Sequence, residues 1–73
     1  MSPEKMIRMA NQIATFFESQ PKDDKAGEVA AHLIEFWEPR MLEKLSVHVA
    51  GGGDGLSPLA LDGATRASAK AKG

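Results

Sequence analysis

The chain has 73 residues, no cysteine, and nine basic against ten acidic side chains, which give a net charge of −1. This length allows one small domain, and chains of about 60 residues bury only ~60% of their unfolded surface. The composition excludes disulfides and thiolate metal sites, and the interspersed charges offer no basic field for nucleic acid or anionic lipid. Without a disulfide or a thiolate metal site, a partner is the expected source of additional stability.

The N-terminal residues show no targeting signal. Met1-Ser2-Pro3-Glu4-Lys5 lacks the basic region and apolar run of a signal peptide, and no apolar stretch approaches the ~20 residues needed to span a bilayer. Together with the absence of cysteine, which suits a reducing compartment, these features predict a cytoplasmic protein.

A first helix is predicted to begin at Ser2-Pro3-Glu4, where a capping hydroxyl precedes a proline and an acid. Apolar residues then recur at the helical period until Pro21 ends the segment. They are Met6, Ile7, Met9, Ala10, Ile13, Ala14, Phe16 and Phe17.

A second helix is predicted after Asp23 or Asp24, either of which can cap it. Its pattern repeats that of the first helix twenty residues later, and the short linker predicts that the two helices lie antiparallel. In that arrangement the aromatic pairs Phe16/Phe17 and Phe36/Trp37 would lie at opposite ends of the hairpin.

The most informative segment is Phe36-Trp37-Glu38-Pro39-Arg40-Met41, which contains the only tryptophan. Pro39 disfavours helical geometry at Glu38, so the second helix must end or kink there. Because its missing N–H costs nothing at a first helical position, Pro39 can begin a third helix that extends to about Val49.

The remaining residues predict little regular structure. Gly51-Gly52-Gly53-Asp54-Gly55 is expected to end the third helix and to be flexible, and Ser57-Pro58 can start one helical turn. From residue 65 onward there is no large apolar side chain to bury. The sequence therefore predicts an all-α fold, with a single three-helix domain at residues 1–64 and a disordered basic tail at residues 65–73.

The apolar faces of the first two helices are wider than the ~100° that one buried face requires. Three helices cannot cover them, and large exposed apolar patches usually mark binding sites. Trp and Arg dominate many binding interfaces, so we expect the bend after the second helix to bind a partner. The expected partner-binding residues are Phe36, Trp37, Pro39, Arg40 and Met41. The alternative is that Trp37 belongs to the chain's own core.

Other kinds of site fit the sequence poorly. The glycine run is not followed by the Lys-Ser/Thr of a phosphate loop. Glu28, His32 and Glu35 share a helix face but are better explained as a solvated polar surface than as a metal site, and no catalytic triad can be assembled. We therefore expect no catalytic, cofactor-binding or metal-binding residues. A helix-turn-helix DNA-binding module is the alternative, although the second helix exposes acids rather than bases.

The combination of several segments resembles the small delta subunit of NAD-dependent formate dehydrogenases. The Phe-Trp-x-Pro-Arg-Met segment is the most specific, and the resemblance covers most of residues 5–64. The other segments are Met9-Ala10-Asn11-Gln12-Ile13-Ala14-x-Phe16-Phe17, Val29-Ala30-x-His32-Leu33 and Gly52-Gly53-x-Gly55-Leu56-x-Pro58-Leu59.

The resemblance implies a non-catalytic accessory subunit of a large cytoplasmic enzyme complex. In that family the cofactors, a molybdenum or tungsten pterin, iron–sulfur clusters, FMN and NAD, belong to the larger subunits. The delta subunit is expected to bind none of them and to support the assembly or stability of the complex, most directly of the catalytic subunit.

Overall fold

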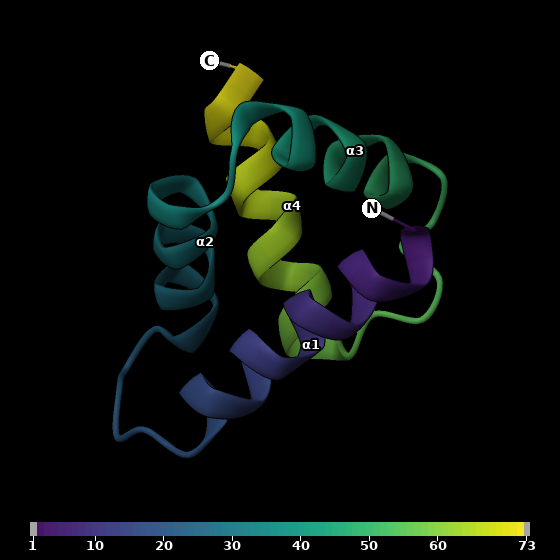
Figure 1. Ribbon diagram of the computed structural model, residues 1–73. Helices are drawn as coiled ribbons and strands as arrows, with labels where there is room; N and C mark the ends of the chain where they lie inside the picture. Colours follow the sequence, from purple (N-terminus) through teal and green to yellow (C-terminus); the bar gives the residue numbers. More distant parts are fainter. Residues whose placement is uncertain (1, 73) are drawn as a thin grey trace.

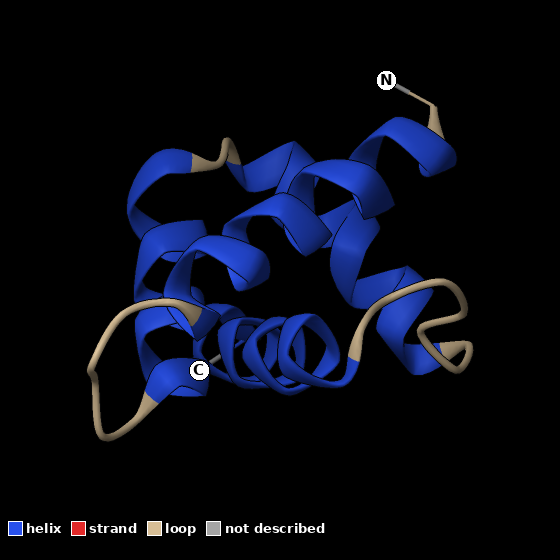
Figure 2. Cartoon of the chain, turned by 90° about the horizontal axis from the view of Figure 1, so that it is seen from below, coloured by secondary structure: helices blue, strands red, loops and turns tan. Residues whose placement is uncertain are grey.

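The computed structural model describes residues 2–72, which form four helices joined by short loops (Figures 1 and 2). The helices are α1 (Pro3–Glu18), α2 (Lys25–Phe36), α3 (Pro39–Ala50) and α4 (Pro58–Lys72). No strand occurs among these residues, so the predicted all-α class is confirmed. Helix α4 runs through the middle of the molecule, and the other three helices lie around it (Figure 1).

The predicted starts of the first two helices are confirmed. The Ser2 hydroxyl accepts a hydrogen bond from the Lys5 backbone N–H at 3.2 Å, and the Asp24 carboxylate accepts one from Gly27 N–H at 3.2 Å. Each bond satisfies a donor that the first helical turn leaves without an intrahelical partner. Of the two candidate caps for α2, the structure therefore selects Asp24.

The predicted bend at Pro39 is also present. Helix α2 ends at Phe36. The Trp37 N–H donates the last hydrogen bond of this helix to the Leu33 carbonyl, at 3.0 Å. Trp37 and Glu38 are extended, with ψ of 140° and 149°, and Pro39 is the first residue of α3. The extended geometry is what a following proline imposes on the residue before it.

The prediction of a short C-terminal turn and a disordered tail is wrong, and so is the count of three helices. Ser57 does cap the segment, since its hydroxyl accepts from Ala60 N–H at 3.2 Å, but the helix continues to Lys72. Ala67, which the sequence analysis placed in the tail, is fully buried. Residue 73 lies outside the described residues.

Small residues form the fully buried face of α4, while its two large apolar side chains, Leu59 and Leu61, are only partly buried. Its buried positions recur at three and four residues, which is one face of a helix. They are Ala60, Gly63, Ala64 and Ala67. Such a face lets neighbouring backbones approach closely, and it meets Val29 and Leu33 of α2 and Leu45 of α3 in the core. The sequence analysis looked for large side chains and missed this pattern.

The predicted antiparallel hairpin is not what α1 and α2 form. Both helices pack on α4. In Figure 1, α1 runs diagonally across the lower end of α4 and ends below α2, rather than running back alongside α2. As a result, the aromatic pairs Phe16/Phe17 and Phe36/Trp37 lie around one hollow instead of at opposite ends. The fourth helix accounts for the difference, because it takes the position beside α2 that the hairpin would have filled.

The glycine segment between α3 and α4 forms a defined turn. Gly53 is buried with φ of +65°, a left-handed conformation that side chains rarely adopt. Its N–H donates to the His48 carbonyl at 2.9 Å, and the His48 imidazole Nε2 donates to the Asp54 carbonyl at 2.7 Å. These bonds close the end of α3, so the glycines supply turn geometry rather than the flexibility expected from composition.

Candidate functional site

The five residues expected to bind a partner fall into different environments. Trp37 is only 7% exposed and belongs to the core, where Leu33 and Leu45 also lie. Phe36 beside it is 66% exposed. The structure thus places Trp37 in the position that the alternative interpretation described, while Phe36 faces solvent.

The other three residues begin α3. Pro39 and Arg40 are exposed, and Met41 is half-buried against the core. The bend therefore turns the chain from one surface to another, and its residues contribute to two separate hollows.

Phe36 belongs to a hollow of about 500 Å³ between α1 and α2, here called the aromatic hollow. It is lined by Met9, Gln12, Ile13, Phe16, Phe17, His32, Phe36 and Trp37. Phe16 is 57% exposed at its edge. Two large exposed aromatic rings on one rim form an apolar surface of the kind that usually marks an interaction site.

The rings around the aromatic hollow contact one another in sequence. Phe16 and Phe17 are 5.1 Å apart between ring centroids at 77°, Phe17 and His32 are 6.0 Å apart at 70°, and His32 and Phe36 are 4.6 Å apart at 36°. Edge-to-face pairs at such distances are favourable beyond the area they bury. The continuous row of rings holds Phe36 in a defined place although most of it is exposed.

His32 is thus part of an aromatic cluster rather than of a metal site. The described residues contain no group of three or more His, Cys, Asp or Glu side chains able to hold a metal ion. The sequence analysis placed His32 on a solvated polar surface, whereas the structure shows it half-buried. The i,i+4 spacing of His32 and Phe36, together with the matching Phe16-Phe17, was the signal that could have revealed the cluster.

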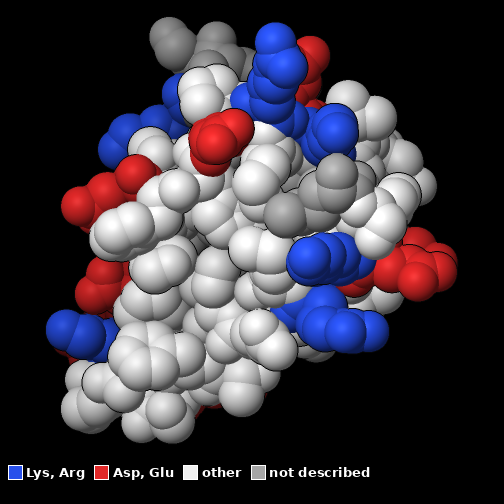
Figure 3. All heavy atoms as spheres, viewed as in Figure 1, with Lys and Arg blue, Asp and Glu red and all other residues white. Residues whose placement is uncertain are grey.

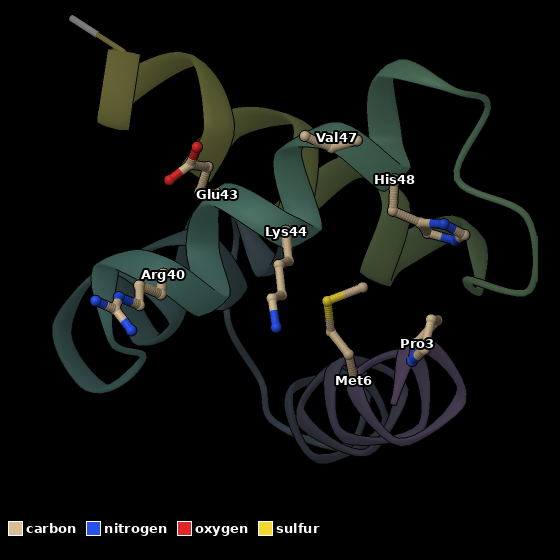
Figure 4. A pocket seen from close by; sticks show the side chains of 7 residues that line it. All are labelled: Pro3, Met6, Arg40, Glu43, Lys44, Val47 and His48. Atoms are coloured by element: carbon tan, nitrogen blue, oxygen red, sulfur yellow. The ribbon is translucent and has the colours of Figure 1, made fainter. Parts of the chain in front are cut away.

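Arg40 belongs to a second hollow, of about 660 Å³, between α3 and the start of α1. We call it the α1–α3 hollow, and it is lined by Pro3, Met6, Arg40, Glu43, Lys44, Val47 and His48. Figure 4 shows Lys44 extending from α3 toward α1, with Met6 pointing up from α1 to meet it. Glu43 turns away from both (Figure 4). The two hollows share no lining residue.

One side chain fastens α1 to the start of α4. The Asn11 amide nitrogen donates to the Gly55 carbonyl at 3.0 Å, and its amide oxygen accepts from Ser57 N–H at 2.9 Å. The sequence analysis named Asn11 only within a segment that carries the family resemblance and gave it no structural role. A two-sided amide contact with residues 44 and 46 positions away in the chain has no signature in a single sequence.

A second polar contact fastens α4 to the start of α2. The Arg66 guanidinium donates to both Asp24 carboxylate oxygens, at 2.9 and 3.0 Å, and to the Asp62 carboxylate at 3.2 Å. The charges of Asp24 and then Asp62 raise the pKa of Arg66 above its ordinary value. Arg66 therefore stays charged at any ordinary pH, and the contact orders the helix that was expected to be a tail.

The surface charges are mixed, as Figure 3 shows for one face. Helix α3 exposes Glu43 beside Arg40 and Lys44, and α2 exposes Glu35, so nothing in these helices favours a DNA-reading surface. No helix among the described residues combines the length and the apolarity that crossing a bilayer would require.

Comparison with known proteins identifies the family. Neither the curated proteins nor the solved structures gave a match to this chain. A family model described as the NADH-dependent formate dehydrogenase delta subunit FdsD matches residues 5–64, which include all of the bend, most of α1 and the first half of α4. The chain therefore belongs to the family of NADH-dependent formate dehydrogenase delta subunits, FdsD.

Proposed function

We propose that this chain is a non-catalytic accessory subunit that supports the assembly or stability of a cytoplasmic, NAD-dependent formate dehydrogenase complex. The observation that carries the proposal is the family match across residues 5–64. A subunit of a multi-subunit enzyme must bind other subunits.

The cofactors of the reaction are assigned to the larger subunits. A molybdenum or tungsten pterin, iron–sulfur clusters and FMN, with NAD as the electron acceptor, are what the family resemblance implies for the complex. The absence of cysteine from the sequence supports this division, because iron–sulfur clusters are held mainly by cysteine thiolates.

The surface proposed to bind the larger subunit is the bend with its neighbouring aromatic hollow. Phe36 supplies an exposed ring, and the neighbouring Trp37 anchors the backbone at this point because its side chain is buried in the core. Pro39 begins α3 and so sets the direction of the helix that carries Arg40 and Met41. Pre-organised aromatic anchors lose little conformational entropy on binding. The proposed partner is the catalytic subunit, because the family resemblance implies that the delta subunit supports the assembly or stability of that subunit.

Co-expression tests the proposal. The larger formate dehydrogenase subunits are produced with and without this chain, and the amount of assembled complex and the rate of formate-dependent NAD⁺ reduction are measured. The proposal expects less complex and proportionally less activity without the chain, with activity per assembled complex unchanged. Equal yields of complex in both preparations would contradict it, and formate oxidation by the isolated chain would show that it is catalytic.

A further inference from the structure

The α1–α3 hollow combines an apolar floor with two cations, Arg40 and Lys44, that form no ion pair with any carboxylate of the described residues. The ion pairs among the described side chains join Lys22 to Glu28, and Arg66 to Asp24 and Asp62. Neither Arg40 nor Lys44 takes part in one, although charged groups of both signs surround them. Glu43 also lines the hollow, but Figure 4 shows its carboxylate directed away from Lys44 and Met6, and it forms no ion pair with either cation.

The arrangement of the hollow follows from the fold. Helices α1 and α3 both pack on α4 and contact each other little, so a gap remains between them. Met6, only 5% exposed, closes the gap from below, and Val47, 69% exposed, adds an apolar group on α3. Arg40 and Lys44 are one turn apart on α3. Both line the hollow; Figure 4 shows Lys44 extending toward α1 and Arg40 at the start of α3, at the outer end of the hollow.

From this geometry we infer that the α1–α3 hollow binds a segment of the larger subunit that carries carboxylates beside apolar side chains. The apolar groups would cover Met6 and Val47, and the carboxylates would pair with Arg40 and Lys44. Arg presents a planar fork that matches a carboxylate in two parallel hydrogen bonds, which gives such a contact direction as well as charge. The inference rests on the proposed function for the existence of a larger subunit, and it adds the chemistry of the segment that is recognised.

Charge reversal tests the inference in the assembled complex. The double variant Arg40→Glu and Lys44→Glu is compared with Lys70→Glu, a reversal at an exposed position of α4 that lies outside the hollow. Affinity for the purified larger subunits is measured at low and at high salt. The double variant should bind at least about tenfold more weakly than the wild type at low salt. High salt should reduce this difference in affinity between the double variant and the wild type. Lys70→Glu should bind like the wild type at both salt concentrations.

A second variant guards against an effect on folding. Arg40→Gln with Lys44→Met removes both charges while keeping unbranched side chains that favour a helix, and circular dichroism should show unchanged helicity because both side chains are exposed. Its affinity should lie between those of the wild type and the reversed variant. Wild-type affinity in the neutral variant, or in a folded reversed variant, would overturn the inference while leaving the proposed function intact. If the wild-type chain itself fails to bind the larger subunits, the proposed function fails instead.

Two other occupants would give different results. A polyanion would appear as salt-sensitive retention on heparin that the double variant loses while it still binds the larger subunits. A second copy of the chain would appear as a dimer in gel filtration that the double variant abolishes, again with subunit binding unchanged. Either outcome would overturn the assignment of the hollow to an acidic segment.

Discussion

Gly63 of α4 lies so close to Val29 of α2 that a Cβ atom at Gly63 would stand 2.6 Å from the Val29 Cβ. Real Cβ atoms do not approach so closely, and the Ala26 carbonyl, 3.4 Å away, limits movement on the other side. The contact between α2 and α4 thus depends on the absence of a side chain at one position.

Gly63→Ala should therefore destabilise the chain. Overpacking a tight contact costs about 1–3 kcal/mol, which exceeds the ~0.5–1 kcal/mol gained by replacing a helical glycine with alanine. Urea unfolding followed by circular dichroism measures the net effect. Gly51→Ala is the control, since a Cβ there meets only backbone oxygens at 3.6 Å and φ is negative. Equal stability of both variants would show that α2 and α4 are not in this close contact.

Asn11 should contribute to stability through its two hydrogen bonds to the segment before α4. Asn11→Ala leaves the part-buried Ser57 N–H without its acceptor and frees the exposed Gly55 carbonyl, which water can then reach. We therefore expect a loss of about 0.5–1.5 kcal/mol, the net contribution of an ordinary hydrogen bond. Urea unfolding is again the measurement, with Gln12→Ala on the exposed side of α1 as the control. A loss no greater than that of the control would mean that the loop is held by other contacts.

The Asp24 carboxylate serves two purposes, which two substitutions separate. Asp24→Asn keeps an acceptor for Gly27 N–H but loses the charge that pairs with Arg66, whereas Asp24→Ala loses both. We expect Asp24→Ala to cost ~1 kcal/mol as a lost N-cap. Asp24→Asn should cost less, and its cost should shrink with added salt because only the exposed ion pair is lost. If the two variants lose the same amount of folding stability, the hydrogen bond from Gly27 N–H to the residue 24 side chain does not stabilise α2.

The same ion pair has a predictable pH dependence on its basic side. The folded-state pKa of Arg66 is raised by the charges of Asp24 and Asp62, so the guanidinium is charged at every pH below its ordinary pKa. The stabilisation from Arg66 is therefore complete at neutral pH and is lost only as strongly alkaline pH titrates the group. Between pH 7 and 9, the difference in unfolding free energy between wild type and Arg66→Gln should stay constant. A difference that falls across this range would contradict the assignment.

Trp37 and Phe36 should have separable roles despite being neighbours. Trp37→Ala removes a buried core side chain and should cost ~3–5 kcal/mol of folding stability, so helicity should fall. Phe36→Ala changes an exposed residue and should alter stability by no more than about 0.5 kcal/mol. If Phe36 is an interface anchor, the same substitution should weaken binding to the larger subunit by ~2–4 kcal/mol. Circular dichroism and a binding assay on both variants test the two roles.

The sequence predicted the helix boundaries at those positions where one residue alone determines the local backbone conformation. Ser2, Asp24 and Pro39 each act on their own turn, and their effects on helix boundaries were read correctly. Helix α4 was missed because its packing depends on small side chains, whose value appears only when a neighbouring helix approaches. The polar contacts of Asn11 and Arg66 were missed for a related reason, since each joins segments more than 40 positions apart.

The candidate site was only partly predictable for the same physical reason. The bend at Pro39 follows from local geometry, but which of its residues face solvent depends on α4, whose packing buries Trp37 and leaves Phe36 exposed. With three helices the wide apolar faces would remain open. The fourth helix covers much of that surface. Among the residues that the structure describes, the large hydrophobic side chains that stay exposed are Phe16, Ile34, Phe36 and Val47.

The central claim is that this chain functions as a bound subunit, and purification of the complex from native cells tests it most directly. The larger formate dehydrogenase subunits are isolated through a tag on the catalytic subunit, and the recovery of this chain is measured by mass spectrometry. We predict recovery in a fixed ratio for the wild type, and reduced recovery when Phe36→Ala is introduced into an otherwise folded chain. Purified, active complex that contains none of this chain, together with no loss of complex when its gene is deleted, would contradict the account.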